Sequence, residues 1–211
     1  SKNSLKLPQL ISLKASAESN LSDVISKNTN YNNKVNERIT AFSGLKSFST
    51  RLVNALQTTD ATPETIGNAK TFNRKMQGKK ASSAQTPTDP NTPAPTTIST
   101  SQQSYDQLIQ HLSGLTSVLE AETSYTPNET DLQVATIQAK IADLTAKNTA
   151  VATAYTSISN SRITRNETLY SSTTGLVETA NEVKKYVKSV FGTSSPQFAQ
   201  VKGIEFKKLK I

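Results

Sequence analysis

The stretch that decides the fold is residues 29–53, TNYNNKVNERITAFSGLKSFSTRLV, which returns 124 positions later as residues 153–177, TAYTSISNSRITRNETLYSSTTGLV. The two segments align without a gap and share 11 of 25 residues, including the Arg-Ile-Thr steps that begin at Arg38 and Arg162. A repeat of such a long period reflects architecture rather than local propensity. It predicts two related structural units within the 211 residues.

Apolar residues around each copy recur at spacings of three and four, which is typical of an amphipathic helix close to a heptad register. The first stripe spans residues 8–57 and the second about 130–191, and the pattern leaves open whether each is one helix or a kinked one. The Asn-rich residues 28–33 are the predicted place for a kink or break. The first stripe consists of Leu10, Leu13, Ala17, Leu21, Val24, Tyr31, Val35, Phe42, Leu45, Leu52 and Leu56.

Start and stop signals flank the second copy. Thr130 or Asn128 can cap a helix start after Pro127, and Gly192 predicts the end of that helix. A further amphipathic stretch over residues 105–122 has Ser104 as its predicted N-cap. We therefore expect an all-α protein, an elongated helical bundle of two related long-helix units.

The predicted organisation has three parts. Residues 1–80 form the first helical repeat with a basic tail, and residues 104–211 form the second repeat with its own basic tail. Between them, residues 81–103 are rich in Pro, Thr and Ser and nearly devoid of apolar side chains. Such a composition is typical of a flexible linker.

Composition argues against most chemistry. Hydrophobic residues make up 34% of the chain, there is no Cys, and His111 is the single His. The sequence has neither a glycine-rich phosphate loop nor a metalloprotease or serine-hydrolase motif, so we predict no enzyme, no cofactor, no metal and no small-molecule substrate. His111 lies at the edge of an apolar stripe, where we expect a structural role because one His without partners makes no metal site.

Compartment is not predicted by these features. No apolar run approaches the length of a membrane span, so we expect no transmembrane segment. The chain begins Ser1-Lys2-Asn3 without Met or a signal-peptide pattern. We expect a processed or truncated form, cytoplasmic or exported after loss of an N-terminal segment.

The formal charge of +8 is unevenly placed. Residues 70–80 carry five cations and no acid, residues 183–211 carry seven lysines and one acid, and the remaining sequence is net negative. The candidate residues for binding an anion or a partner are Arg38, Arg162, Lys70, Arg74, Lys75, Lys79, Lys80, Lys202, Lys207, Lys208 and Lys210. Arg38 and Arg162 are equivalent anion sites in one interpretation and arginines of the helix seam in the other. The basic segments either grip an anionic polymer or membrane surface, or are solvated.

The C-terminal segment YVKSVFGTSSPQF, residues 186–198, is similar to the close of a group of uncharacterised bacterial tandem-repeat helical proteins. In that group an apolar-Gly-x-x-Ser-Pro turn follows a long helix and precedes a short basic segment. The resemblance implies a tandem helical architecture and no known activity. The first copy has no equivalent of the Phe191-Gly192 step.

The sequence thus favours a structural or protein-interaction protein, with a protein partner or self-association through helix faces or basic tails. The alternative is a binder of an anionic polymer or membrane surface through the basic segments that follow the long helices.

Overall fold

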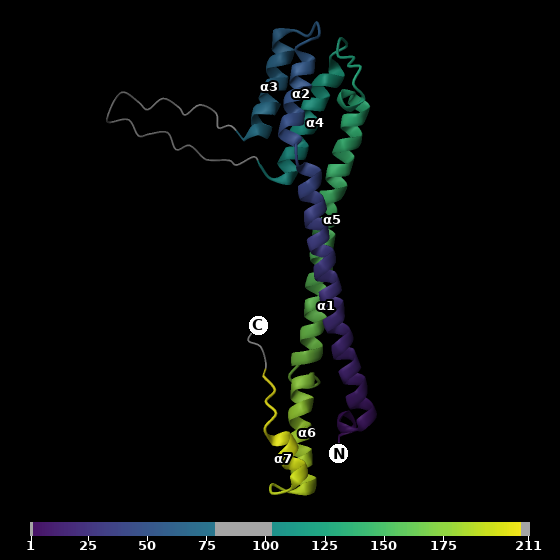
Figure 1. Cartoon of the computed structure of the whole chain (residues 1–211), viewed down its shortest axis with the longest axis vertical. Helices are drawn as coiled ribbons and strands as arrows, with labels where there is room; N and C mark the ends of the chain where they lie inside the picture. The colour runs from purple at the N-terminus through teal and green to yellow at the C-terminus, as the bar shows by residue number, and fades with distance from the viewer. Residues whose placement is uncertain (1, 79–102, 208–211) are drawn as a thin grey trace, which may run out of the picture. The chain divides into compact units, whose positions relative to one another are not determined.

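The computed structural model describes residues 2–78 and 103–207, and every regular element in these ranges is a helix. The predicted all-α class is confirmed for them. The predicted linker lies outside the described residues apart from Gln103. The elements are η1 (Asn3–Leu5), α1 (Leu7–Phe42), α2 (Leu45–Leu56), α3 (Pro63–Gln77), α4 (Tyr105–Ala121), η2 (Thr130–Leu132), α5 (Val134–Tyr170), α6 (Leu176–Phe191) and α7 (Pro196–Lys202), with η denoting a 3-10 helix (Figure 1).

The helices form two compact units, each of which is described by itself. Unit 1 comprises residues 1–33 and 152–211, and unit 2 comprises residues 34–151. The long helices α1 and α5 each contribute one part to unit 1 and the other part to unit 2. Each unit therefore contains pieces of both predicted repeats, residues 1–80 and 104–211.

Unit 2 is a helical bundle with a continuous apolar core. α2, α3 and α4 pack together beside the last turns of α1 and the first half of α5 (Figure 1). The close approach of α3 to α4 requires a glycine at position 114, because a Cβ atom there would lie 2.3 Å from the Phe72 ring. The core consists of Leu45, Leu52, Val53, Leu56, Ala69, Met76, Leu112, Leu115, Leu119, Tyr125, Leu132, Ile137 and Leu144.

Unit 1 is built on the antiparallel packing of the first part of α1 against the second part of α5. The amide of Asn20 donates to the Thr168 hydroxyl (2.8 Å), and the Ser161 hydroxyl donates to Asp23 (2.6 Å). Residue numbers rise along α1 as they fall along α5, which fixes the antiparallel direction. The buried apolar residues of this unit are fewer and smaller than those of unit 2, and they comprise Ala17, Ala154, Ile158, Leu169 and Val177.

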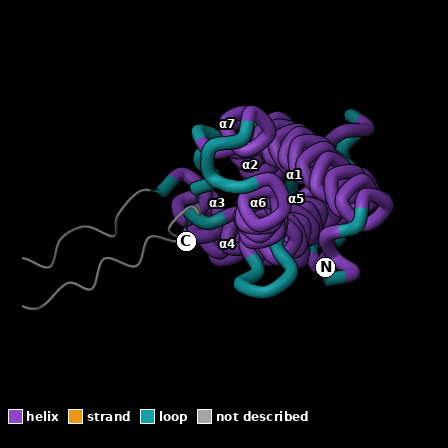
Figure 2. Tube along the Cα trace, turned by 90° about the horizontal axis from the view of Figure 1, so that it is seen from below, coloured by secondary structure: helices purple, strands orange, loops and turns teal. Residues whose placement is uncertain are grey.

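The remaining helices of unit 1 are held by polar contacts near the surface. Lys2, just before η1, pairs with Glu182 of α6. The Lys184 ammonium of α6 donates to the backbone carbonyls of Lys202 (3.0 Å) and Ile204 (2.6 Å), which ties the end of α7 to α6. Figure 2 shows the loops that connect these helices.

A break at residues 28–33 is not found, because α1 is helical throughout this stretch. Asn costs a helix only a few tenths of a kcal/mol relative to good helix formers, roughly 0.5 kcal/mol. Packing offsets that cost, since the Tyr31 ring lies 5.9 Å from the Tyr155 ring of α5. The first break falls at Gly44 instead, which has the left-handed φ of 74°. The second stripe breaks at residues 171–175, so neither stripe is a single helix.

Two of the predicted helix start and stop signals are confirmed and one is wrong. Ser104 caps α4 as expected, accepting a hydrogen bond from the Gln107 amide, and Gly192 follows the last residue of α6. The prediction that Thr130 or Asn128 caps the second long helix is wrong. Residues 130–132 form the separate η2 turn, and α5 begins at Val134.

Residues 63–77 form helix α3 and are not a tail. The Thr62 hydroxyl accepts from the Thr65 amide at the N-cap, and Pro63 occupies the first turn, where its missing N–H costs nothing. Ala69 and Met76 lie seven residues apart on one face and are fully buried. The cations of this segment therefore stand on the outer face of a packed helix.

Two glycines make a matched test of the break between α1 and α2. We expect Gly44→Ala to lower the free energy of unfolding by about 1 kcal/mol, because a Cβ atom is strained at this left-handed φ. Gly67→Ala, in the middle of α3 with open space around its Cα, should raise it by about 0.5–1 kcal/mol. Urea unfolding followed by circular dichroism measures both. Equal effects of the two substitutions would contradict a conformational role for Gly44.

Candidate interaction surfaces

Arg38 lies in the helix seam of unit 2. Its guanidinium stacks 4.0 Å from the centre of the Tyr105 ring, and its Nη1 donates to the Asn148 side chain (3.0 Å). Asn148 in turn donates to Asp106 (2.7 Å), and the Phe42 ring meets the Tyr105 ring edge-on. These contacts link α1, α4 and α5. The seam interpretation describes this arginine better than an open anion site does.

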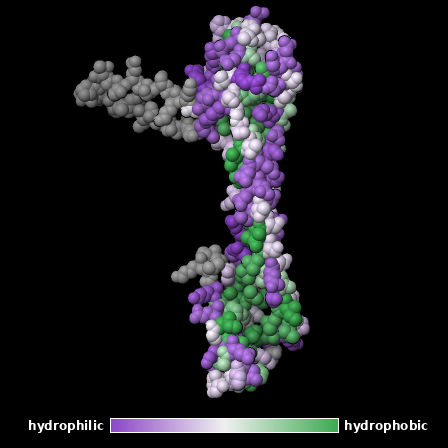
Figure 3. Space-filling view, in the orientation of Figure 1, coloured by the Kyte–Doolittle hydropathy of each residue, from purple (hydrophilic) through white to green (hydrophobic). Residues whose placement is uncertain are grey.

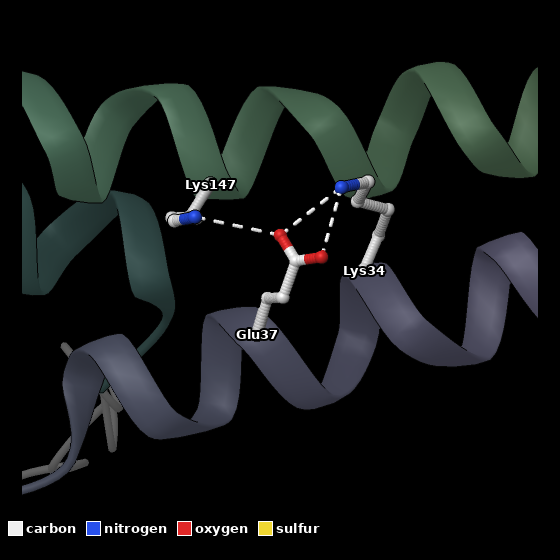
Figure 4. Close-up of polar contacts among 3 residues, drawn as sticks. All are labelled: Lys34, Glu37 and Lys147. Carbon is white, nitrogen blue, oxygen red and sulfur yellow. Dashed lines mark hydrogen bonds and ion pairs between the residues drawn. The ribbon is translucent and has the colours of Figure 1, made fainter.

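A second polar cluster lies directly beside the first on the same two long helices, since Glu37 precedes Arg38 and Lys147 precedes Asn148. Glu37 of α1 accepts from Lys34 (2.9 Å) and from Lys147 of α5 (3.4 Å), as Figure 4 shows. The hydrogen bond from Lys34 is the largest cause of a Glu37 pKa below the ordinary value. The carboxylate therefore stays ionised at neutral pH and pairs the two helices within unit 2.

Arg162, which the sequence alignment pairs with Arg38, has a different environment. It lies in unit 1, its side chain is exposed, and no contact within the described residues holds it. The repeat partner of Asn148 is Val24, which offers no acceptor. The two arginines are thus equivalent in sequence but not in surroundings.

The basic residues of the first segment are spread along α3 in unit 2. Lys70 and Arg74 are exposed one turn apart, and Arg74 donates to the Thr71 hydroxyl (3.0 Å). The Lys75 ammonium lies 5.8 Å from the centre of the Phe72 ring. Lys79 and Lys80 lie outside the described residues.

The basic residues of the second segment lie in unit 1. Lys202 ends α7, and Lys207 pairs with Glu205 at 3.3 Å, with both side chains largely in solvent. Lys185 and Lys188 are exposed on α6. Lys208 and Lys210 lie outside the described residues.

Unit 1 exposes most of the large apolar side chains found on the surface. Of twelve exposed large hydrophobic residues in the described ranges, eleven belong to unit 1, and Ile39 alone belongs to unit 2. Figure 3 shows hydrophobic residues gathered over the parts of α1 and α5 that belong to unit 1. The eleven are Leu7, Ile11, Leu21, Ile25, Tyr155, Ile163, Tyr186, Val190, Phe191, Ile204 and Phe206.

Unit 1 also carries nearly all of the net charge. Its sequence ranges contain thirteen Lys or Arg against six Asp or Glu, a formal net charge of +7, whereas the ranges of unit 2 carry +1. Exposed apolar side chains on a unit of positive net charge are typical of a contact surface rather than of a catalytic pocket.

Other kinds of site have little support in the described ranges. No cluster of three or more His, Asp or Glu side chains there could hold a metal ion. None of the described helices is long and apolar enough to cross a membrane.

Comparisons with known proteins give no relatives for this chain. No protein-family model matches it, and neither a curated protein nor a solved structure is significantly similar to it. The resemblance of residues 186–198 to a group of bacterial helical proteins stays a prediction.

Sequence reasoning missed the exposed apolar residues of α1. Leu7, Ile11 and Ile25 were not part of the predicted stripe, and Leu21 was assigned to the packed seam with Leu10 and Leu13. A signal was present, because α1 carries apolar residues on two faces rather than one. Periodicity alone does not say which of two stripes faces a neighbouring helix.

His111 is a buried side chain of α4 in unit 2, in line with the expected structural role. Only 5% of its surface is exposed, and its Nε2 has no hydrogen-bond partner in the part of the chain that is described. Burial, reinforced by the nearby charge of Lys75, lowers the pKa of His111 from its ordinary value of 6.5. The imidazole is therefore neutral in the folded protein at neutral pH.

This burial predicts a specific pH dependence. Below pH 6.5 the unfolded chain binds a proton at His111 that the folded protein resists, so the free energy of unfolding should fall as the pH drops through this range. His111→Gln should remove this component, because the chain has no other His. Urea unfolding of both proteins between about pH 7.5 and 5.5, above the range of carboxylate titration, measures the difference. If the free energy of unfolding of the two proteins changed equally with pH, the predicted contribution of His111 would be contradicted.

Proposed function

We propose that this chain is a non-enzymatic protein-interaction protein, built from a duplicated helical unit, whose contact surface lies on unit 1. The observation that carries the proposal is the gathering of exposed large apolar side chains on that unit. Monomeric proteins rarely expose contiguous apolar patches larger than a few hundred Å², because such surface is costly in water. A partner that covers these residues removes that cost.

The order of elements supports the duplication. A 3-10 turn, a long helix, a shorter helix and a Pro-initiated helix follow one another twice, as η1–α1–α2–α3 and as η2–α5–α6–α7. The long helices have 36 and 37 residues. Tyr31 and Tyr155, which the repeat aligns with each other, are also in contact. Two antiparallel copies related by a two-fold axis would bring matched residues together in this way.

The surface beside α6 and α7 is a suitable place for a partner to bind. Tyr186 and Val190 lie one turn apart on α6, with Phe191 next to them, and all three are exposed. Lys185 and Lys188 stand on the same helix, also exposed. Aromatic side chains contribute large contact area at low entropic cost, so they are common anchors of protein interfaces. The exposed lysines Lys185 and Lys188 favour a partner that carries acidic residues beside an apolar patch.

Variants of α6 test this function. We expect Tyr186→Ser combined with Phe191→Ser to abolish binding of the natural partner, because two apolar anchors are removed while the buried residues stay intact. Ile39→Ser is the matched control, since Ile39 is similarly exposed but belongs to unit 2. Quantitative mass spectrometry of proteins captured from the native cell extract compares the three baits. The proposed surface would be refuted if the α6 variant captured every protein that the wild type captures, or if Ile39→Ser lost the same proteins.

The alternative function, binding of an anionic polymer or membrane surface, is favoured by the net charge of +7 on unit 1. Each Lys near an anionic lipid surface contributes about 1 kcal/mol at low salt. We expect Lys185→Glu with Lys188→Glu to weaken binding to phosphatidylserine vesicles or heparin about tenfold or more, and Lys70→Glu with Arg74→Glu on unit 2 to have little effect. Sedimentation with vesicles at about 50 mM and 200 mM salt measures this, and wild-type protein that stays unbound at low salt would dismiss this function.

A further inference from the structure

The first part of α1 carries two apolar faces, and only one of them is packed. Leu10, Leu13, Ala17 and Val24 share a helix face with Asn20, which bonds Thr168 of α5, and they are half-buried or, for Ala17, buried. A second set stands at positions 7, 11, 14, 18, 21 and 25, so successive members are four or three residues apart. This spacing is that of the a and d positions of a coiled coil. We call these six residues the outer stripe of α1.

The outer stripe is free in the structure. The exposed fractions are 70% for Leu7, 59% for Ile11, 43% for Leu21 and 69% for Ile25. Between these two apolar pairs lie Lys14 and Glu18, whose side chains are 74% and 64% exposed. All six residues belong to unit 1 and to one uninterrupted helix.

When two outer stripes run in opposite directions, apolar residues of one stripe meet apolar residues of the other and opposite charges meet. In an antiparallel pair of α1 helices whose facing residue numbers add to 32, Leu7 meets Ile25, Ile11 meets Leu21, and Lys14 meets Glu18 of the other copy. Every apolar residue then faces an apolar residue, and both lysines face carboxylates. A parallel pair would instead place Lys14 against Lys14 and Glu18 against Glu18, where like charges repel.

We propose that two copies of this chain associate through the outer stripes of their α1 helices, antiparallel, with the Lys14–Glu18 pairs at the centre. The arrangement is a two-fold interface in which each copy contributes the same surface. In antiparallel coiled coils a positions pack against d positions, which is the pairing that this register gives. Ala15 and Ser22, which flank the stripe on the side away from α5, are small enough to let the helices approach.

The ion pair seen within one chain does not oppose this association. Lys14 and Glu18 lie 3.4 Å apart at positions i and i+4. Lys before Glu is the weaker of the two orders for such a pair, because both charges oppose the helix dipole. Exchanging it for two interhelical pairs in a partly desolvated seam therefore costs little.

Charge exchange tests the proposal with its register. We expect wild-type protein to form dimers with a dissociation constant in the micromolar range, as suits an interface of about five helical turns. Lys14→Glu alone and Glu18→Lys alone each place like charges opposite one another twice, so each should weaken self-association by at least about tenfold. A mixture of the two single variants should form a heterodimer, and the double variant should dimerise as the wild type does, because both restore opposite charges.

Analytical ultracentrifugation over a concentration series measures all five samples, with Lys6→Glu as the control for an equal change of charge outside the stripe. Ile25→Asp should abolish the dimer, and circular dichroism confirms that each variant is folded. The proposal would be overturned if the wild-type protein stayed monomeric up to about 100 µM, or if the charge exchanges left the dissociation constant of the dimer unchanged.

The self-association rests on the proposed function because it names one partner for the surface of unit 1. The two fail separately. If the wild-type protein is monomeric, the dimer proposal fails, but the capture experiment with the α6 variants still tests the proposed function. If capture does not depend on α6, the proposed function fails, but ultracentrifugation still tests the dimer.

Discussion

The packing of α1 against α5 is the contact on which both units depend, because each unit is built around a stretch of these two helices. In unit 1 that contact relies on a few buried apolar residues, such as Ala17 and Ile158, and on hydrogen bonds between polar side chains, such as Asn20 with Thr168. In unit 2 it is reinforced by Glu37 between two lysines and by Arg38 between Tyr105 and Asn148. Polar residues in a helix seam specify which helices pair and in what register, at some expense of stability.

The two units differ in what covers this helix pair. In unit 2, α2, α3 and α4 surround it and bury a continuous core. In unit 1, the buried residues of α6 are Val177 and Thr179, and its larger side chains Tyr186, Val190 and Phe191 are exposed. The described part of unit 1 also has no equivalent of α4. A helix pair that is surrounded is a stable scaffold, whereas one that is only partly covered presents surface for another molecule.

Sequence periodicity predicted the helical class, the cap at Ser104 and the end of α6 at Gly192, because each depends on local chemistry. The sequence pattern placed the break at residues 28–33, whereas the structure has it at Gly44. Residues 28–33 stay helical because packing of Tyr31 on Tyr155 outweighs the weak helix propensity of Asn. Helix α3 was missed because its apolar face is short, consisting of Ile66, Ala69, Phe72 and Met76, and its cations dominate the pattern. The outer stripe of α1 was missed because Lys14 and Glu18 interrupt it and make it resemble a solvated face.

The distribution of apolar residues gives the clearest link between fold and function. A chain with only 34% hydrophobic residues has few large side chains with which to build its cores. Burying Leu or Ile stabilises a protein by about 1.5–3 kcal/mol, and leaving it in water forgoes that gain. Unit 1 nevertheless keeps Leu7, Ile11 and Ile25 more than half exposed while Ala17 occupies the packed face of the same helix. Helix α1 thus places Leu7, Ile11 and Ile25 on a face that a second helix can reach, while a different face of the same helix packs on α5. This arrangement fits a helix whose outer face is completed by association.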